Sequence, residues 1–72
     1  MLKLVKEYMI LPIGTIPTIE DVDYAITIAK QNDCLVYMKW FFNYSGWYSV
    51  YIEPDDIAQA VWENQIPHTY GV

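Results

Sequence analysis

Apolar and polar residues alternate along residues 18–32 with the period of an amphipathic helix. The apolar positions at helical spacing are Ile19, Val22, Ala25, Ile26 and Ala29. Thr18 is a favourable N-cap, and Asp21 stands three residues later, where it completes a capping box. Asn32 and Asp33 then end the pattern. The sequence therefore predicts a helix over 18–32 that packs one face on a core.

Residues 34–53 alternate with a period of two and predict a β-hairpin. A three-residue loop would place Gly46 where the backbone must be left-handed. In that register we expect four facing pairs, namely Asn43 with Trp47, Phe42 with Tyr48, Trp40 with Val50, and Met38 with Ile52.

This register sorts the hairpin residues into two chemically different faces. The inner face would hold Val36, Met38, Trp40, Phe42, Tyr48, Val50 and Ile52. The outer face would hold Tyr37, Lys39, Phe41, Trp47, Ser49, Tyr51 and Glu53. A loop one residue shorter or longer would mix Ser49 and Glu53 with Met38 and Trp40, so we favour the three-residue loop.

A second helix is predicted over residues 54–64. Pro54 suits the first helical position, and Asp55 and Asp56 suit the positive end of the helix dipole. The expected apolar stripe is Ile57, Ala58, Val61 and Trp62. Pro67 would stop the helix and leave 66–72 as a short flexible tail.

The first ten residues fit either a helix or a strand. No N-cap precedes them, and the run Tyr8-Met9-Ile10-Leu11 before Pro12 looks extended. Because a lone hairpin needs a third strand or a covering helix, we favour a strand. The expected fold is then α+β with the order β-α-β-β-α. It is one domain over 1–72, a small, mainly antiparallel three-stranded sheet with both helices on one face.

The net charge of the chain limits the classes of partner that it is expected to bind. Nine carboxylates oppose four lysines, and the formal net charge is −5 without a single arginine. Nucleic acids and anionic membranes attract clustered Lys and Arg, whereas the lysines here are scattered among acids. We therefore expect no direct binding to nucleic acid or membrane, and a protein partner with a basic surface instead.

The sequence offers no recognisable catalytic or cofactor site. His68 is the one imidazole and lies in the expected tail, while Cys34 begins the first hairpin strand on its inner side, where a thiol would be buried and inert. No run of about 20 apolar residues is present, and no signal peptide is recognised. We expect a cytoplasmic protein that is not an enzyme and binds neither metal nor cofactor.

Two acidic clusters stand out, formed by Glu20, Asp21 and Asp23 and by Glu53, Asp55 and Asp56. Either could bind a divalent cation or imitate a run of phosphates, but the spacing of a calcium-binding EF-hand is absent. Charge compensation at helix N-termini would explain both clusters.

Aromatic residues supply the main functional hint, since eight of the twelve fall between Tyr37 and Tyr51. The candidate protein-binding residues are Tyr37, Lys39, Phe41, Tyr44 at the loop tip, Trp47, Tyr51 and Glu53, with Glu20, Asp21, Asp23, Asp55 and Asp56 as acidic contacts. Exposed apolar patches often mark interaction sites, and Tyr and Trp are frequent at their centres.

We expect a small acidic module that binds and inhibits or modulates a larger cytoplasmic protein. Size, acidity and aromatic density suit a phage-type inhibitor of a host nucleic-acid-binding protein. The alternative is a homodimeric structural or assembly component that uses the same face for self-association.

Three other readings stay open. In the first, the N-terminal segment or the tail covers the aromatic face. In the second, a small molecule binds between Trp40, Tyr48 and Trp62. In the third, single-stranded bases stack on the outer rings. The last reading lacks the positive charge that usually accompanies it.

Overall fold

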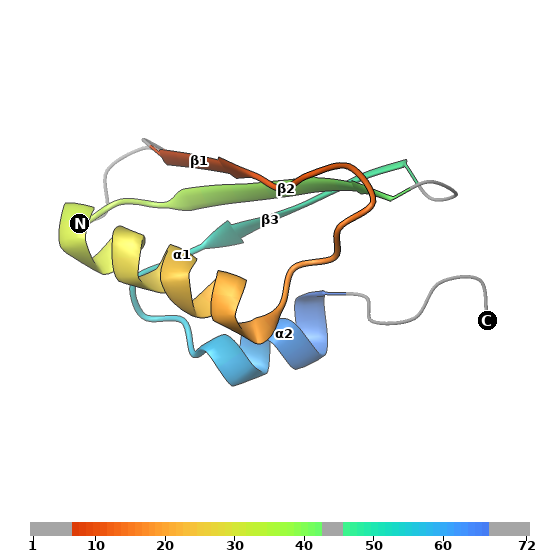
Figure 1. Cartoon of the computed structure of the whole chain (residues 1–72). Helices are drawn as coiled ribbons and strands as arrows, with labels where there is room; N and C mark the ends of the chain where they lie inside the picture. The colour runs from red at the N-terminus through yellow and green to blue at the C-terminus, as the bar shows by residue number, and fades with distance from the viewer. Residues whose placement is uncertain (1–6, 43–45, 67–72) are drawn as a thin grey trace.

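The computed structural model describes residues 7–42 and 46–66. The elements are β1 (Glu7–Ile10), α1 (Ile19–Asn32), β2 (Val36–Phe42), β3 (Gly46–Ile52) and α2 (Ala58–Gln65). The central strand β2 pairs parallel with β1 and antiparallel with β3. Both helices lie on the same side of this mixed sheet (Figure 1). The α+β class and the β-α-β-β-α order are confirmed.

The strand expected near the N-terminus is confirmed for Glu7–Ile10, whereas residues 1–6 lie outside the described part. Parallel pairing needs a long crossover, which α1 provides between β1 and β2. The chain continues along β2 beyond Ile10. The Leu11 N–H donates to the Lys39 carbonyl at 3.0 Å, and the Gly14 N–H donates to the Phe41 carbonyl at 2.8 Å.

Helix α1 forms as its sequence predicts. The Thr18 N–H donates to Asp21 Oδ2 at 2.9 Å, and Thr18 Oγ1 accepts from the Asp21 N–H at 3.2 Å, which makes the capping box. Asp33 ends the helix in a left-handed conformation with φ of 50°. The buried residues of α1 are Val22, Ala25, Ile26 and Ala29, and Ile19 is half-buried.

The two faces of the hairpin are as expected, but the facing pairs are wrong by two positions. Trp40 faces Tyr48, Met38 faces Val50, and Phe42 faces Gly46. A shift of two residues keeps every side chain on its original face, so the sorting survives. Gly46 has φ of 85°, which confirms the left-handed backbone, and residues 43–45 lie outside the described part.

Aromatic pairing explains the observed register. It sets three pairs of rings directly opposite each other, Tyr37 with Tyr51, Trp40 with Tyr48, and Phe41 with Trp47. The expected register would have paired only Phe42 with Tyr48. Directly opposed aromatic residues stabilise a sheet by roughly 0.2–1 kcal/mol per pair relative to a pair of alanines.

The start of α2 differs from the expectation. The Asp56 N–H donates to the Glu53 carbonyl at 3.1 Å, and Asp56 Oδ2 accepts from the Glu53 N–H at 2.7 Å. These bonds close a turn, so the helix begins at Ala58 rather than at Pro54, and its first turn holds no acid. Helix-dipole compensation is therefore the wrong explanation for Asp55 and Asp56.

The same shift changes which residues of this region enter the core. Ile57 is 69% exposed, in contrast to the predicted apolar stripe, whereas Ile66 is buried at 3% exposure although the pattern placed it in the tail. Val61 is buried as expected. The strands contribute Val36, Met38, Trp40, Val50 and Ile52 to the same core, and Cys34 is buried as predicted.

Candidate protein-binding face

The side of the sheet opposite the helices carries a group of rings that we call the aromatic face, made up of Tyr8, Tyr37, Phe41, Trp47 and Tyr51. Side chains alternate between the two faces of a strand, and the residues of β2 and β3 that are buried in the core are all even-numbered, namely Val36, Met38, Trp40, Val50 and Ile52. The odd-numbered residues therefore point away from α1 and α2. No helix of the described chain covers this side of the sheet (Figure 1).

The rings form two groups of direct contacts. Tyr37 lies between Tyr8 and Tyr51, with ring centroids 5.7 Å and 4.9 Å apart, so one row of rings crosses all three strands. Phe41 and Trp47 form an edge-to-face pair at 5.2 Å. The Lys39 Nζ lies 4.7 Å from the centroid of the Trp47 ring, which is within the range of a cation–π contact.

Much of this face is accessible to solvent. Tyr8 is 68% exposed, Tyr51 55% and Trp47 54%, while Tyr37, Lys39 and Phe41 are half-buried by their neighbours. Ile10, which shares the parity of Tyr8 along β1, is also exposed. A contiguous exposed group of large apolar side chains is typical of an interaction site.

The structure brings together five of the predicted binding residues, namely Tyr37, Lys39, Phe41, Trp47 and Tyr51. Glu53 follows two residues after Tyr51 and is exposed, and Tyr44 lies outside the described residues. The sequence reasoning missed Tyr8 and Ile10. Their spacing of two was visible, but the parallel pairing that sets them beside Tyr37 and Lys39 was not.

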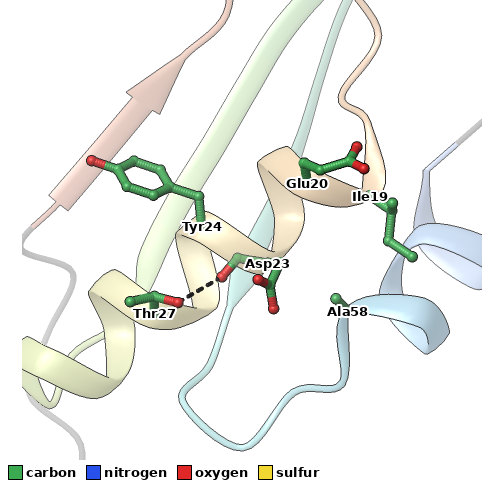
Figure 2. A pocket seen from close by; sticks show the side chains of 6 residues that line it. All are labelled: Ile19, Glu20, Asp23, Tyr24, Thr27 and Ala58. Atoms are coloured by element: carbon green, nitrogen blue, oxygen red, sulfur yellow. Dashed lines mark hydrogen bonds between the residues drawn. The ribbon is translucent and has the colours of Figure 1, made fainter.

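The acidic residues of α1 lie on the other side of the sheet. Asp21 is occupied by the capping box, whereas Glu20 and Asp23 are exposed. Figure 2 shows these two residues at a shallow hollow of about 390 Å³, which is also lined by Ile19, Tyr24, Thr27 and Ala58. One flat partner surface cannot contact both this hollow and the aromatic face.

Glu53, Asp55 and Asp56 share the turn after β3, and Asp56 is occupied by the turn itself. Within 7–42 and 46–66, no group of three His, Cys, Asp or Glu side chains could hold a metal ion.

The inner aromatic residues pack against each other. Trp40 and Tyr48 stack with centroids 5.6 Å apart, and the Trp62 Nε1 donates to the Pro17 carbonyl at 3.3 Å. These contacts use the ring surfaces that a small-molecule site between Trp40, Tyr48 and Trp62 would need. His68 lies outside the described residues.

No protein-family model, curated protein or solved structure matches this chain. Among the helices that the structure describes, none is long and apolar enough to cross a membrane.

Proposed function

We propose that this chain is a non-enzymatic protein-binding module that docks its aromatic face on a larger cytoplasmic protein and inhibits or modulates it. The observation that supports this proposal is the row of mutually contacting rings on the side of the sheet that neither α1 nor α2 covers (Figure 1). Tyr and Trp present large contact areas with few rotatable bonds, which is why they often anchor interfaces.

Charge indicates the chemistry of the partner. The module carries a net charge of −5, and Glu53 and Asp55 are exposed next to the Tyr51 end of the aromatic face. An apolar patch with a basic rim would complement this arrangement and speed the encounter. The more specific form of the proposal is a phage-type inhibitor that occupies the basic surface of a host nucleic-acid-binding protein.

The carboxylates of α1 would act on the partner at a distance. Glu20 and Asp23 belong to α1, which lies on the opposite side of the sheet from the aromatic face (Figure 1), so they would steer the approach through the overall field rather than contact the partner. Direct binding of single-stranded nucleic acid is disfavoured, because Lys39 is the single cation among the described residues of β1, β2 and β3, and it lies over Trp47.

A second candidate function is self-association through the same face, as in a structural or assembly component. It is favoured by the absence of acidic side chains between the rings, since Lys39 is the one charged residue within β2 and β3. Two copies could therefore approach face to face without opposing carboxylates.

The substitution Trp47→Ala tests the docking proposal. Capture from a host lysate identifies the bound protein, and titration with that purified protein then gives the affinity. We expect Trp47→Ala to cost about 2 kcal/mol of binding, or roughly a 30-fold weaker Kd. Tyr24→Ala is the matched control, since Tyr24 is an equally exposed ring at 60% on α1, away from the aromatic face.

Circular dichroism must show that both variants keep their helices. Equal affinities of Trp47→Ala and wild type would contradict docking through this face. Repeating the titration at high salt separates aromatic packing from charge complementarity, because salt screens the latter.

A further inference from the structure

β3 is the longer of the two edge strands in the described sheet, with seven residues against four in β1. The strand order β1-β2-β3 leaves one side of β3 without a neighbouring strand (Figure 1). This feature is separate from the aromatic face, because it concerns the backbone at the margin of the sheet rather than the side chains on its surface.

The hydrogen bonds of β2 show which backbone groups of β3 are unpaired. Lys39 and Phe41 direct their carbonyls towards the β1 side, where Leu11 and Gly14 donate to them. The N–H and C=O groups of successive residues in a strand point to opposite sides. Those of Met38 and Trp40 therefore point towards β3, where they bond with Val50 and Tyr48. The N–H and C=O groups of Trp47, Ser49 and Tyr51 therefore point outwards.

Nothing in residues 7–42 and 46–66 bonds to this edge, and β3 lacks the usual protection of an edge strand. Natural edges are blunted by charged residues, proline, a bulge or short length. β3 has seven residues, Gly-Trp-Tyr-Ser-Val-Tyr-Ile, with no charge and no proline, and it pairs with β2 residue for residue without a bulge. The other edge strand, β1, has four residues and begins with Glu7.

We propose that β3 pairs antiparallel with β3 of a second copy of this chain, around a two-fold axis at Ser49. Ser49 then faces Ser49 of the second copy, and Trp47 faces Tyr51 of the second copy on each side of the axis. Each facing pair exchanges two hydrogen bonds, so this register satisfies all the outward groups of both strands, whereas shifted registers leave some unpaired.

The side chains favour a second copy as the occupant. On the outer face, each Trp47 meets a Tyr51, which adds two cross-strand aromatic pairs. No like charges meet across the axis, because β3 carries none. The unpaired edge ends at Glu53, whose N–H and C=O are both bonded to Asp56. The product is a six-stranded sheet in which the two aromatic faces become continuous.

Charges at Ser49 test this pairing and its register. The wild-type protein should sediment as a dimer across the micromolar range. Ser49→Thr is the neutral control and should sediment in the same way. Ser49→Lys and Ser49→Glu should each weaken the dimer by about tenfold or more, because like charges then face each other at the axis. An equimolar mixture of these two variants should restore the dimer as a heterodimer.

Circular dichroism and thermal unfolding of each monomer establish that the fold is kept. A monomeric wild type at hundreds of micromolar overturns the proposal. A dimer that is unaffected by both Ser49→Lys and Ser49→Glu also overturns the proposal. So does a dimer that only Ser49→Lys weakens, because Ser49 faces Lys39 within the chain and repulsion between these two lysines would explain that result.

Phe41→Ala separates this dimer from the function proposed above. Phe41 lies on the central strand, so its loss should reduce binding through the aromatic face and leave the β3 edge intact. A dimer lost in Phe41→Ala but kept in the Ser49 variants would assign self-association to the face and overturn edge pairing. The Ser49 variants in turn leave Tyr37 and Phe41 in place for the partner titration.

Discussion

At the scale of single residues, two similar carboxylate–amide bonds have opposite consequences. Asp21 and Asp56 each accept a hydrogen bond from the backbone N–H three residues earlier, that of Thr18 and of Glu53 respectively. The Thr18 hydroxyl oxygen in turn accepts a hydrogen bond from the Asp21 N–H, and a helix begins there. At Glu53 the backbone carbonyl accepts from Asp56 instead, and the chain forms a turn.

The cap of α1 yields a prediction at this scale. Thr18→Ala removes the hydroxyl that accepts from Asp21, so the free energy of unfolding should fall by about 1 kcal/mol. Urea titration followed by circular dichroism measures it. Thr27→Ala is the control within the same helix, because Thr27 is exposed and bonds to the carbonyl of Asp23 rather than to an unpaired amide. An equal loss in both variants would mean that the cap contributes nothing specific.

At the scale of elements, what the sequence predicted depended on local signals. The cap and the apolar period of α1 lie within a few residues of each other, and the alternation along 36–52 fixes the faces of the hairpin whether or not its register is right. The aromatic face could therefore be anticipated from Tyr37, Phe41, Trp47 and Tyr51.

Contacts between residues far apart in the sequence determined the features that the sequence did not predict. The parallel pairing of Tyr8 with Tyr37 joins residues separated by all of α1, and no pattern in either strand records it. The hairpin register was set by the stacking of Trp40 on Tyr48 and two further ring pairs rather than by loop length alone. The start of α2 depended on a turn that resembles a helix cap in sequence.

The two isoleucines that flank α2 give a matched test at this scale. Ile66→Ala removes a buried side chain and should lower the free energy of unfolding by about 2–4 kcal/mol, whereas Ile57→Ala should change it by less than about 0.5 kcal/mol. Chemical denaturation of both variants measures the difference. The reverse order would mean that α2 packs as the sequence pattern predicted, with Ile57 in the core.

At the scale of the whole molecule, charge and aromatic surface are separated. The carboxylates described on α1, α2 and their ends lie in the helix layer or in the turn before α2, whereas β2 and β3 carry only Lys39. The separation exceeds what the sequence alone indicated, because Glu20 and Asp23 were expected to act together with the aromatic residues. Contacts made by the side chains of β2 and β3 on this side of the sheet should therefore depend little on salt, whereas those made by Glu53 and Asp55 at its margin should weaken as salt rises.

Cys34 reports on the stability of the whole fold. Its thiol is fully buried two residues before β2, so a thiol reagent should react only when the molecule opens. We expect slow labelling in buffer that accelerates with urea in parallel with global unfolding. Gln31→Cys combined with Cys34→Ala supplies an exposed thiol as the control, which should react at once. Rapid labelling of Cys34 without denaturant would show that the N-terminal end of β2 opens locally.

The parallel pairing of β1 with β2 also has a consequence for synthesis on the ribosome. Glu7 pairs with Val36, so 29 residues must follow Glu7 out of the exit tunnel to bring out its partner (36 minus 7). At about 5–20 residues per second this delay is roughly 1.5–6 seconds. During that interval Tyr8-Met9-Ile10 is an unpaired apolar segment that a chaperone could bind, whereas β2 and β3 emerge nearly together and can pair at once.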